Sequence, residues 1–189
     1  MSTYKLAVLI SGKGSNAKRL IEFLPLSTKA EFIVISTKEN VSMRSFCHDN
    51  KVLYFEIDGS FELINNCLEN IFLKQKVTHI VLAGFLKKIS SSIITRFEGR
   101  IINLHPSLLP KFGGKGMYGR NVHQAVFDAK EKESGITIHQ VNEIYDEGRI
   151  LAQYKVPIIL SDTVDDIEQK VQELEKSYFP EEVLKFIIE

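Results

Sequence analysis

The stretch KLAVLISGKGSNAKRLIEFL, residues 5–24, decides the fold class. Its first part, Lys5 to Ile10, is an almost continuous apolar run, and a turn rich in glycine follows as far as Asn16. Ala17 to Leu24 has the pattern of a helix, and Pro25 is expected to close it. A strand, a glycine turn and a helix in this order predict the start of a β-α-β unit.

The same alternation of strands and helices continues along the chain. Further strands are predicted at residues 32–35, 52–57, 80–83, 101–104, 136–141 and 150–156, and helices at 43–50, 61–74, 91–97, 121–129 and 164–178, with Pro180 starting a short terminal helix. The strand at 80–83 has almost no polar residue, which is typical of a parallel sheet covered on both faces. We therefore expect one α/β domain over residues 1–189. Its Rossmann-like central sheet should be mostly parallel, with helices on both faces and a mixed far end.

Composition narrows the possible functions. Lys plus Arg and Asp plus Glu both number 24, which argues against a general nucleic-acid binder. The two cysteines, Cys47 and Cys67, form no metal-binding pattern, and no His-rich motif accompanies them, so no metal is expected. We see no signal peptide or membrane-spanning run. These features predict a reduced, cytoplasmic protein that binds neither membranes nor nucleic acid.

The segment GRIINLHPSLLPKF, residues 99–112, carries the clearest chemistry. Side chains alternate along a strand, so Asn103 and His105 should point to the same side. A neutral amide donor beside an imidazole suits acyl transfer without a covalent nucleophile, because the two groups can stabilise a developing oxyanion. The alternative is a pair that only hydrogen-bonds a loop.

The glycine turn after the first strand predicts a phosphate site. Gly12 and Gly14 let the backbone approach an anion at a helix N-terminus, where Ser15 and Asn16 add side-chain donors. The second strand ends in Ser36-Thr37 and has no acidic residue to hold a ribose, which disfavours a nicotinamide cofactor. Alternatively, the glycines only form a tight turn and Ser15 only caps the helix.

Three further features have two interpretations each. Near an imidazole, Asp146 would favour the cation and raise its pKa, although Asp is also common in solvated turns. His139 shares a strand face with Thr137, and it either lines the same pocket or is a hydrogen-bonded core histidine. The loop at 113–119 is either a lid over an anionic ligand or a plain connection.

Four segments in a fixed order resemble one family. They are LISGKGSN at 9–16, VLAGFLKKIS at 81–90, GRIINLHPSLLPKF at 99–112 and SGITIHQVNEIYDEGRILAQ at 134–153. Together they are similar to the phosphoribosylglycinamide formyltransferases of de novo purine (IMP) synthesis. The resemblance implies an enzyme that transfers the formyl group of 10-formyltetrahydrofolate to the amine of 5-phosphoribosylglycinamide. It implies small-molecule substrates alone, and a monomer or homodimer.

The resemblance also implies roles for individual residues. Asn103, His105 and Asp146 match the catalytic trio, which would stabilise a tetrahedral intermediate after direct attack by the amine. The matches to substrate-binding positions are Gly12, Gly14, Ser15 and Asn16 for the phosphate, Glu175 for the glycinamide ribonucleotide, and Leu86, Lys87, Lys88, Ile89, Asn103, Val141, Asn142 and Glu143 for the folate. Phe61, a possible pocket residue, stands where many relatives have arginine, and Lys13 stands where Asn is common.

Related activities remain open at this level. A formyltetrahydrofolate deformylase uses the same trio with water in place of the amine, and other relatives formylate a sugar nucleotide or a charged tRNA. A folate- or nucleotide-binding protein without turnover is a further alternative, which the presence of Asn103, His105 and Asp146 disfavours. The turn at residues 14–16 favours the ribonucleotide as acceptor.

Overall fold

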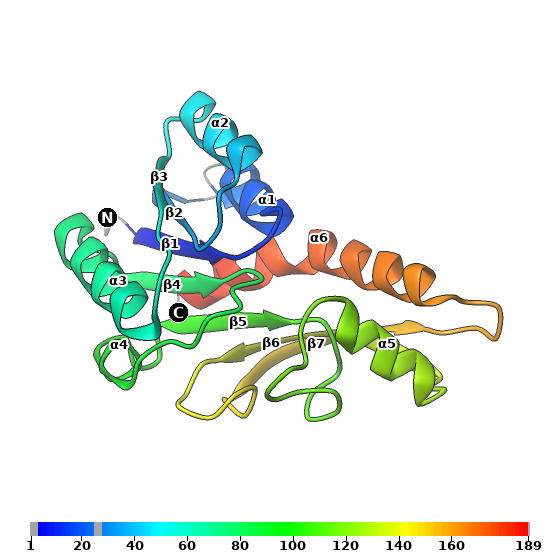
Figure 1. Ribbon diagram of the computed structural model, residues 1–189. Helices are drawn as coiled ribbons and strands as arrows, with labels where there is room; N and C mark the ends of the chain where they lie inside the picture. The colour runs from blue at the N-terminus through cyan, green and yellow to red at the C-terminus, as the bar shows by residue number, and fades with distance from the viewer. Residues whose placement is uncertain (1–3, 25–27, 189) are drawn as a thin grey trace.

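The computed structural model describes residues 4–24 and 28–188, and these form one seven-stranded sheet with helices on both faces (Figure 1). The strands, in chain order, are β1 (Tyr4–Ile10), β2 (Ala30–Ser36), β3 (Leu53–Glu56), β4 (His79–Leu82), β5 (Ile101–His105), β6 (Glu133–Gln140) and β7 (Ile150–Pro157). They lie in the order β3-β2-β1-β4-β5-β6-β7. The first five strands are parallel. β6 and β7 are antiparallel to their neighbours, which confirms the predicted mixed end.

Among the described residues, five helices connect these strands and a sixth follows β7. They are α1 (Ser15–Phe23), α2 (Val41–Asp49), α3 (Phe61–Gln75), α4 (Ser91–Arg96), α5 (Arg120–Asp128) and α6 (Val164–Ile188). Every predicted strand is present, and so is every predicted helix before residue 130, with ends that differ by a few residues. Pro25, the expected end of the first helix, lies outside the described residues. None of the helices described is both long and apolar enough to cross a membrane.

The alternation of side chains along β1 builds two hydrophobic cores. Leu6, Val8 and Ile10 pack on one face of the sheet against α1, α2 and α6. Ala7 and Leu9 pack on the other face against α3 and α4. Both faces of this strand are therefore buried, as its uninterrupted apolar sequence predicts. Cys47 and Cys67 are free thiols.

The final helix departs from the prediction. Instead of ending near Tyr178 and restarting at Pro180, α6 runs without interruption through 25 residues. A proline removes a hydrogen bond from a helix interior, yet Phe179, Pro180 and Val183 are buried here. Packing against the sheet holds the helix together across the proline. At its start, Thr163 and Asp166 cap the helix reciprocally: Asp166 Oδ2 accepts from Thr163 N at 2.8 Å, and Thr163 Oγ1 accepts from Asp166 N at 3.2 Å.

The order of the strands fixes where a ligand can bind. From β1 the chain moves outward to β2 and β3, then crosses back through α3 to β4 on the other side of β1. The turns after β1 and β4 therefore diverge at the carboxyl ends of two adjacent strands. In open α/β sheets this switch point leaves a crevice for ligands.

Candidate active site

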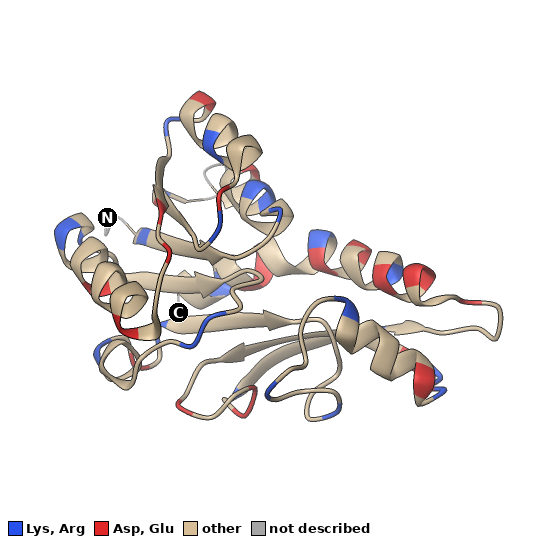
Figure 2. Ribbon diagram, viewed as in Figure 1, with Lys and Arg blue, Asp and Glu red and all other residues tan. Residues whose placement is uncertain are grey.

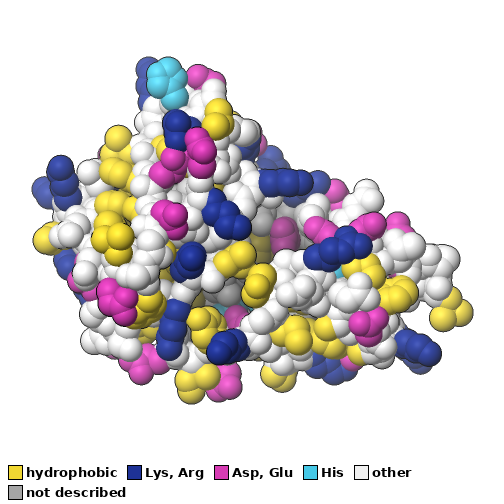
Figure 3. Space-filling model, in the orientation of Figure 1, with side chains coloured by type: hydrophobic (Ala, Val, Ile, Leu, Met, Phe, Trp, Pro, Cys, Tyr) yellow, Lys and Arg dark blue, Asp and Glu magenta, His cyan; other side chains and the backbone are white. Residues whose placement is uncertain are grey.

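A cleft of about 590 Å³ opens at the switch point, and Figure 3 shows the hollow on this face of the molecule. Its walls come from the turns after β1 and β4, from β5, from the loop before α5, from the loop between β6 and β7, and from α6. The lining includes Gly12–Asn16, Leu82–Ile89, Asn103–Pro106, Gly114–Gly119, His123, His139, Val141–Asp146, Glu168, Gln172 and Glu175. Nearly all sequence-predicted site residues therefore meet in one cavity.

One end of the cleft is the turn between β1 and α1. Gly14 has a φ of 77°, in the left-handed region that favours glycine, and α1 begins there without a side-chain cap. By contrast, Asn40, Ser60 and Ser90 cap α2, α3 and α4. The alternative that Ser15 only caps the helix is therefore wrong.

Four basic residues are part of the lining of this cleft. Lys13, Lys87, Lys88 and Lys115 all line it. Figure 2 shows Lys and Arg on the segment after β4 and on the loop that leads into α5. Glu143, Asp146, Glu168 and Glu175 line the cleft as well, so the attraction for anions is confined to the uncapped N-terminus of α1 and Lys13 beside it.

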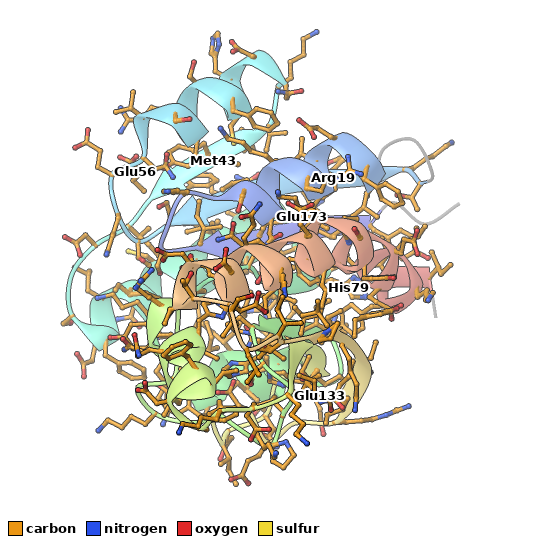
Figure 4. All side chains as sticks on the ribbon, turned by 90° about the vertical axis from the view of Figure 1, so that its right-hand side faces the viewer. Arg19, Met43, Glu56, His79, Glu133 and Glu173 are labelled. Atoms are coloured by element: carbon orange, nitrogen blue, oxygen red, sulfur yellow. The ribbon has the colours of Figure 1, made fainter. Side chains whose placement is uncertain are left out.

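Glu175 of α6 faces the same turn. Figure 4 shows α6 lying beside α1, and Asn16 Nδ2 donates to Glu175 Oε2 at 2.8 Å. Burial raises the pKa of Glu175 above its ordinary value, although the bond from Asn16 acts in the opposite direction. The structure thus joins two predicted ligand residues that lie 159 positions apart in the sequence.

The centre of the cleft is organised around Asn103 on β5. Its Nδ2 donates to His139 Nε2 at 3.1 Å and lies 3.5 Å from Asp146 Oδ1. His139 Nδ1 lies 2.8 Å from the Gln140 carbonyl, which can only accept, so this nitrogen carries the proton and Nε2 is free to accept. Both interpretations of His139 are met, because it is buried and hydrogen-bonded and also lines the cleft.

His105, two residues further along β5, lies on the same side of the strand as Asn103. Its Nε2 donates to the Phe112 carbonyl at 2.8 Å, and its Nδ1 lies 3.6 Å from Asp146 Oδ2. Burial lowers the pKa of His105 more than Asp146 and the Phe112 carbonyl raise it. Asp146 thus acts in the expected direction and raises the pKa of His105, but the net pKa is lowered because the side chain is only 4% exposed and desolvation dominates.

Asp146 is held in the loop between β6 and β7. It adopts a φ of 58°, a conformation that Asp tolerates better than most residues, and its Oδ2 accepts from Gly114 N at 2.8 Å. Burial alone would raise the pKa of Asp146. The contacts with His139, His105 and Gly114 outweigh burial and hold the pKa below its ordinary value. The group is therefore a carboxylate at neutral pH.

One glycine allows this loop to fold back. A Cβ on Gly148 would lie 1.7 Å from the Gln140 carbonyl oxygen, so only glycine fits where the loop rejoins β7. On β6, the buried Thr137 Oγ1 donates to the Ser107 carbonyl at 2.6 Å and accepts from Leu109 N at 3.0 Å. These bonds anchor the chain that carries the Phe112 carbonyl to His105.

Other sequence predictions have mixed outcomes. The segment Leu86–Ile89 and the residues Val141, Asn142 and Glu143 line the cleft as expected. Phe61 does not; it is 46% exposed and borders a smaller hollow with Asn65, Lys87 and Lys88. Within the described residues, no group of three His, Cys, Asp or Glu side chains is placed to hold a metal ion.

Several residues at the site were not identified from sequence. His123 of α5 lines the cleft, is buried, and its Nδ1 has no hydrogen-bond partner among the described residues. Burial also lowers the pKa of His123. The Phe112 carbonyl contacts His105 seven residues away in the sequence, and the Thr137 hydroxyl contacts Ser107 thirty residues away. Only the continuous HPSLLPKF motif signalled that this loop matters.

Comparison with known proteins assigns the fold and cleft to one class. The formyl transferase model matches residues 4–183, so the chain belongs to the formyl transferase family. A curated relative, the chloroplastic phosphoribosylglycinamide formyltransferase of Arabidopsis thaliana, is 39% identical over 95% of this chain and 64% of its own length. The phosphoribosylglycinamide formyltransferase of Haemophilus influenzae is 34% identical over 93% of this chain and 84% of its own length.

The solved structures agree with these relatives. The crystal structure of phosphoribosylglycinamide formyltransferase from Brucella melitensis superimposes with a TM-score of 0.86 at 32% identity, covering 98% of this chain and 96% of that one. The chain spans less than two thirds of the length of the plant relatives that it matches.

Proposed function

We propose that this protein transfers the formyl group of 10-formyltetrahydrofolate to the amine of 5-phosphoribosylglycinamide, a step of de novo purine (IMP) synthesis. The observation that carries the proposal is the meeting of Asn103, His105 and Asp146 in a cleft that has a phosphate-type turn at one end. The similarity to phosphoribosylglycinamide formyltransferases over 93–95% of the chain supports the choice of acceptor.

Asn103 supplies a neutral donor for the developing oxyanion. One hydrogen of its amide is fixed by His139, and the other is held only loosely by Asp146 at 3.5 Å. When the substrate amine attacks the formyl carbon, the carbonyl oxygen gains negative charge, and the second hydrogen can turn towards it. His139 is thus a positioning residue that sets the direction of the Asn103 amide.

His105 supplies a positive charge beside the oxyanion. Its Nε2 proton is committed to the Phe112 carbonyl, so an added proton must reside on Nδ1, which faces Asp146. The lowered pKa keeps the ring neutral in the free protein at neutral pH. The oxyanion and Asp146 together favour the imidazolium, so the positive charge appears when the negative charge develops.

Completion of the reaction requires a proton to move. The attacking amine loses a proton, the bond between the formyl carbon and the folate nitrogen breaks, and that nitrogen gains a proton. Asp146 and His105 lie beside the reacting atoms in this arrangement and can relay the proton, directly or through water. No metal is needed for any of these steps.

The cavity suits two substrates that meet at its centre. Its volume of about 590 Å³ lies within the range of ligand-binding clefts. The uncapped N-terminus of α1 and Lys13 would bind the phosphate, and Glu175 would bind the ribonucleotide beside it. On the opposite side, residues 86–89 and 141–143 would hold the folate.

The direct test follows the release of tetrahydrofolate from 10-formyltetrahydrofolate, with and without 5-phosphoribosylglycinamide. We expect release only when the ribonucleotide is present, together with one equivalent of formylated product. Release without an acceptor would identify a deformylase instead. The absence of release under both conditions would contradict the proposal and point to another acceptor or to a binding protein.

A further inference from the structure

The segment that follows β4, residues 84–90, has no regular secondary structure, yet buried side chains fix it at both ends. It forms part of the wall of the cleft, where Leu86–Ile89 line the cavity. Loops with free backbone groups are ordinarily mobile. The contacts at the two ends explain how this one is held in place.

Ser11, the residue after β1, fixes the first end. Its Oγ accepts from Leu86 N at 3.0 Å, and its own N donates to the Gly84 carbonyl at 2.9 Å. Ser11 Oγ also lies 2.6 Å from Thr37 Oγ1, and either hydroxyl can donate in this bond, because an oxygen that already accepts from Leu86 N still has its own proton and a second lone pair. Ser11 and Thr37 are both buried, so water does not compete for these bonds.

Asn65 of α3 fixes the second end. Its Oδ1 accepts from Ser90 N at 2.8 Å, while its Nδ2 donates to the Lys88 carbonyl at 3.3 Å and to the Phe61 carbonyl at 2.9 Å. The side chain is buried, so the donor and the acceptor of its amide are both committed. A leucine of similar size could make none of these bonds.

Between the two anchors, the backbone is left open. The N–H groups of Lys87, Lys88 and Ile89 and the carbonyls of Leu86 and Lys87 make no hydrogen bond to the described part of the chain. A row of unpaired backbone donors and acceptors at a cleft matches a planar heterocycle whose edge carries both kinds of group. The anchors hold those groups in fixed positions without occupying them.

We infer that Ser11 and Asn65 are positioning residues for the folate co-substrate, acting through the backbone of residues 86–89. The inference rests on the proposed function. Ser11 does not line the cleft, and Asn65 borders the smaller hollow beside it, so neither side chain contacts the ligand in the main cavity. Their effect is preorganisation: a loop already in its binding conformation does not lose conformational entropy when the ligand arrives.

The test uses Asn65→Leu, Ser11→Ala and the matched control Asn66→Leu. Asn66 is the next residue on α3 and is exposed, so the control makes the same substitution on the same helix without touching the loop. We expect the KM for the folate formyl donor to rise about tenfold in each anchor variant, which corresponds to one or two lost hydrogen bonds. The kcat and the KM for the ribonucleotide should stay within about twofold of wild type, and Asn66→Leu should change none of the three.

A second measurement separates this inference from the proposed function. The Kd for tetrahydrofolate alone, measured by calorimetry, should rise by the same factor in both anchor variants. If wild type binds tetrahydrofolate but transfers no formyl group, the proposed function fails while this comparison still decides the inference. If wild type does not bind tetrahydrofolate, both fail.

Two results would overturn the inference in an active protein. One is an unchanged folate KM and Kd in folded Asn65→Leu and Ser11→Ala proteins. The other is a parallel loss of kcat and of affinity for both substrates, which would show a general structural role. Should Asn65→Leu fail to fold, Ser11→Ala, which removes a single hydroxyl, decides the question by the same criteria.

Discussion

The turn at one end of the cleft and the cluster at its centre use their polar groups in opposite ways. At the turn between β1 and α1, the helix N-terminus has no side-chain cap, so its backbone donors remain open to the cleft. At the centre, Asn103, His105, His139 and Asp146 are bonded to one another or to nearby backbone. Open donors suit the binding of an anion, whereas a linked cluster fixes directions. We therefore expect changes at the turn to affect KM and changes at the centre to affect kcat.

The largest effect is expected for His105→Ala. Loss of the group proposed to become an imidazolium should lower kcat by about 10²–10³, with smaller changes in both KM values, because its role lies in the transition state. Steady-state kinetics would measure this. The matched variant His105→Asn keeps a hydrogen-bonding amide but cannot take a proton, so it should lose kcat as well. A kcat within about tenfold of wild type in both variants would contradict the mechanism.

Asp146→Asn tests the electrostatic part of the centre. Asp146 raises the pKa of His105 against the effect of burial, so removal of its charge should lower that pKa further below its ordinary value. A titration of the imidazole by NMR would show the direction of the change. We expect kcat to fall about 10²-fold, since the cation becomes harder to form. An unchanged His105 pKa in the variant would show that the two groups do not interact.

Asn16→Asp tests the turn between β1 and α1. The new carboxylate would lie beside Glu175 and would repel the substrate phosphate, so we expect the KM for the ribonucleotide to rise about tenfold or more with little change in kcat. The same kinetics serve as the measurement. Asn70→Asp, on the exposed face of α3, adds equal charge far from the turn and should be neutral. A fall in kcat with a normal KM would break the proposed division of roles.

The smallest expected effect is on the pH dependence of the free energy of unfolding. Burial lowers the pKa of His105, His123 and His79 in the folded state. Their unfolded pKa is about 6.5, so their contribution to stability is complete above that pH and is lost as pH falls through the lowered folded values. Urea denaturation should show a lower free energy of unfolding at about pH 5 than at about pH 7. His123→Asn should flatten that dependence; an equal slope in the variant would exclude His123 as a contributor.

Local patterns predicted the strands, the helices and the approach of Asn103 to His105. The period of two along β5 was sufficient, because a strand fixes the direction of its side chains. The break expected at Pro180 was wrong, since burial against the sheet outweighs the lost hydrogen bond. Packing of this kind depends on residues far away in the sequence.

The remaining parts of the site were beyond local reasoning. Asp146 was singled out by resemblance, because nothing in its own neighbourhood shows that the loop folds back to β5. The Phe112 carbonyl is a backbone group, which every residue has, so its residue type gave no signal. Ser11 and Asn65 act through their side chains, but their partners in residues 86–90 are backbone groups far away in the sequence. The direction in which the pKa of His105 is shifted depends on the burial of its side chain, and the neighbouring sequence does not show that burial.

The contact between Asn16 and Glu175 has a consequence for the synthesis of the protein. Asn16 lies in the first turn of the chain, while Glu175 lies on α6, which follows all seven strands. Until the ribosome has released α6, the face of the sheet that holds Leu6, Val8 and Ile10 also lacks the part of its cover that α6 provides. The nascent chain therefore cannot assemble a complete binding site before α6 is made. A product truncated before α6 would expose an apolar surface that chaperones and proteases recognise.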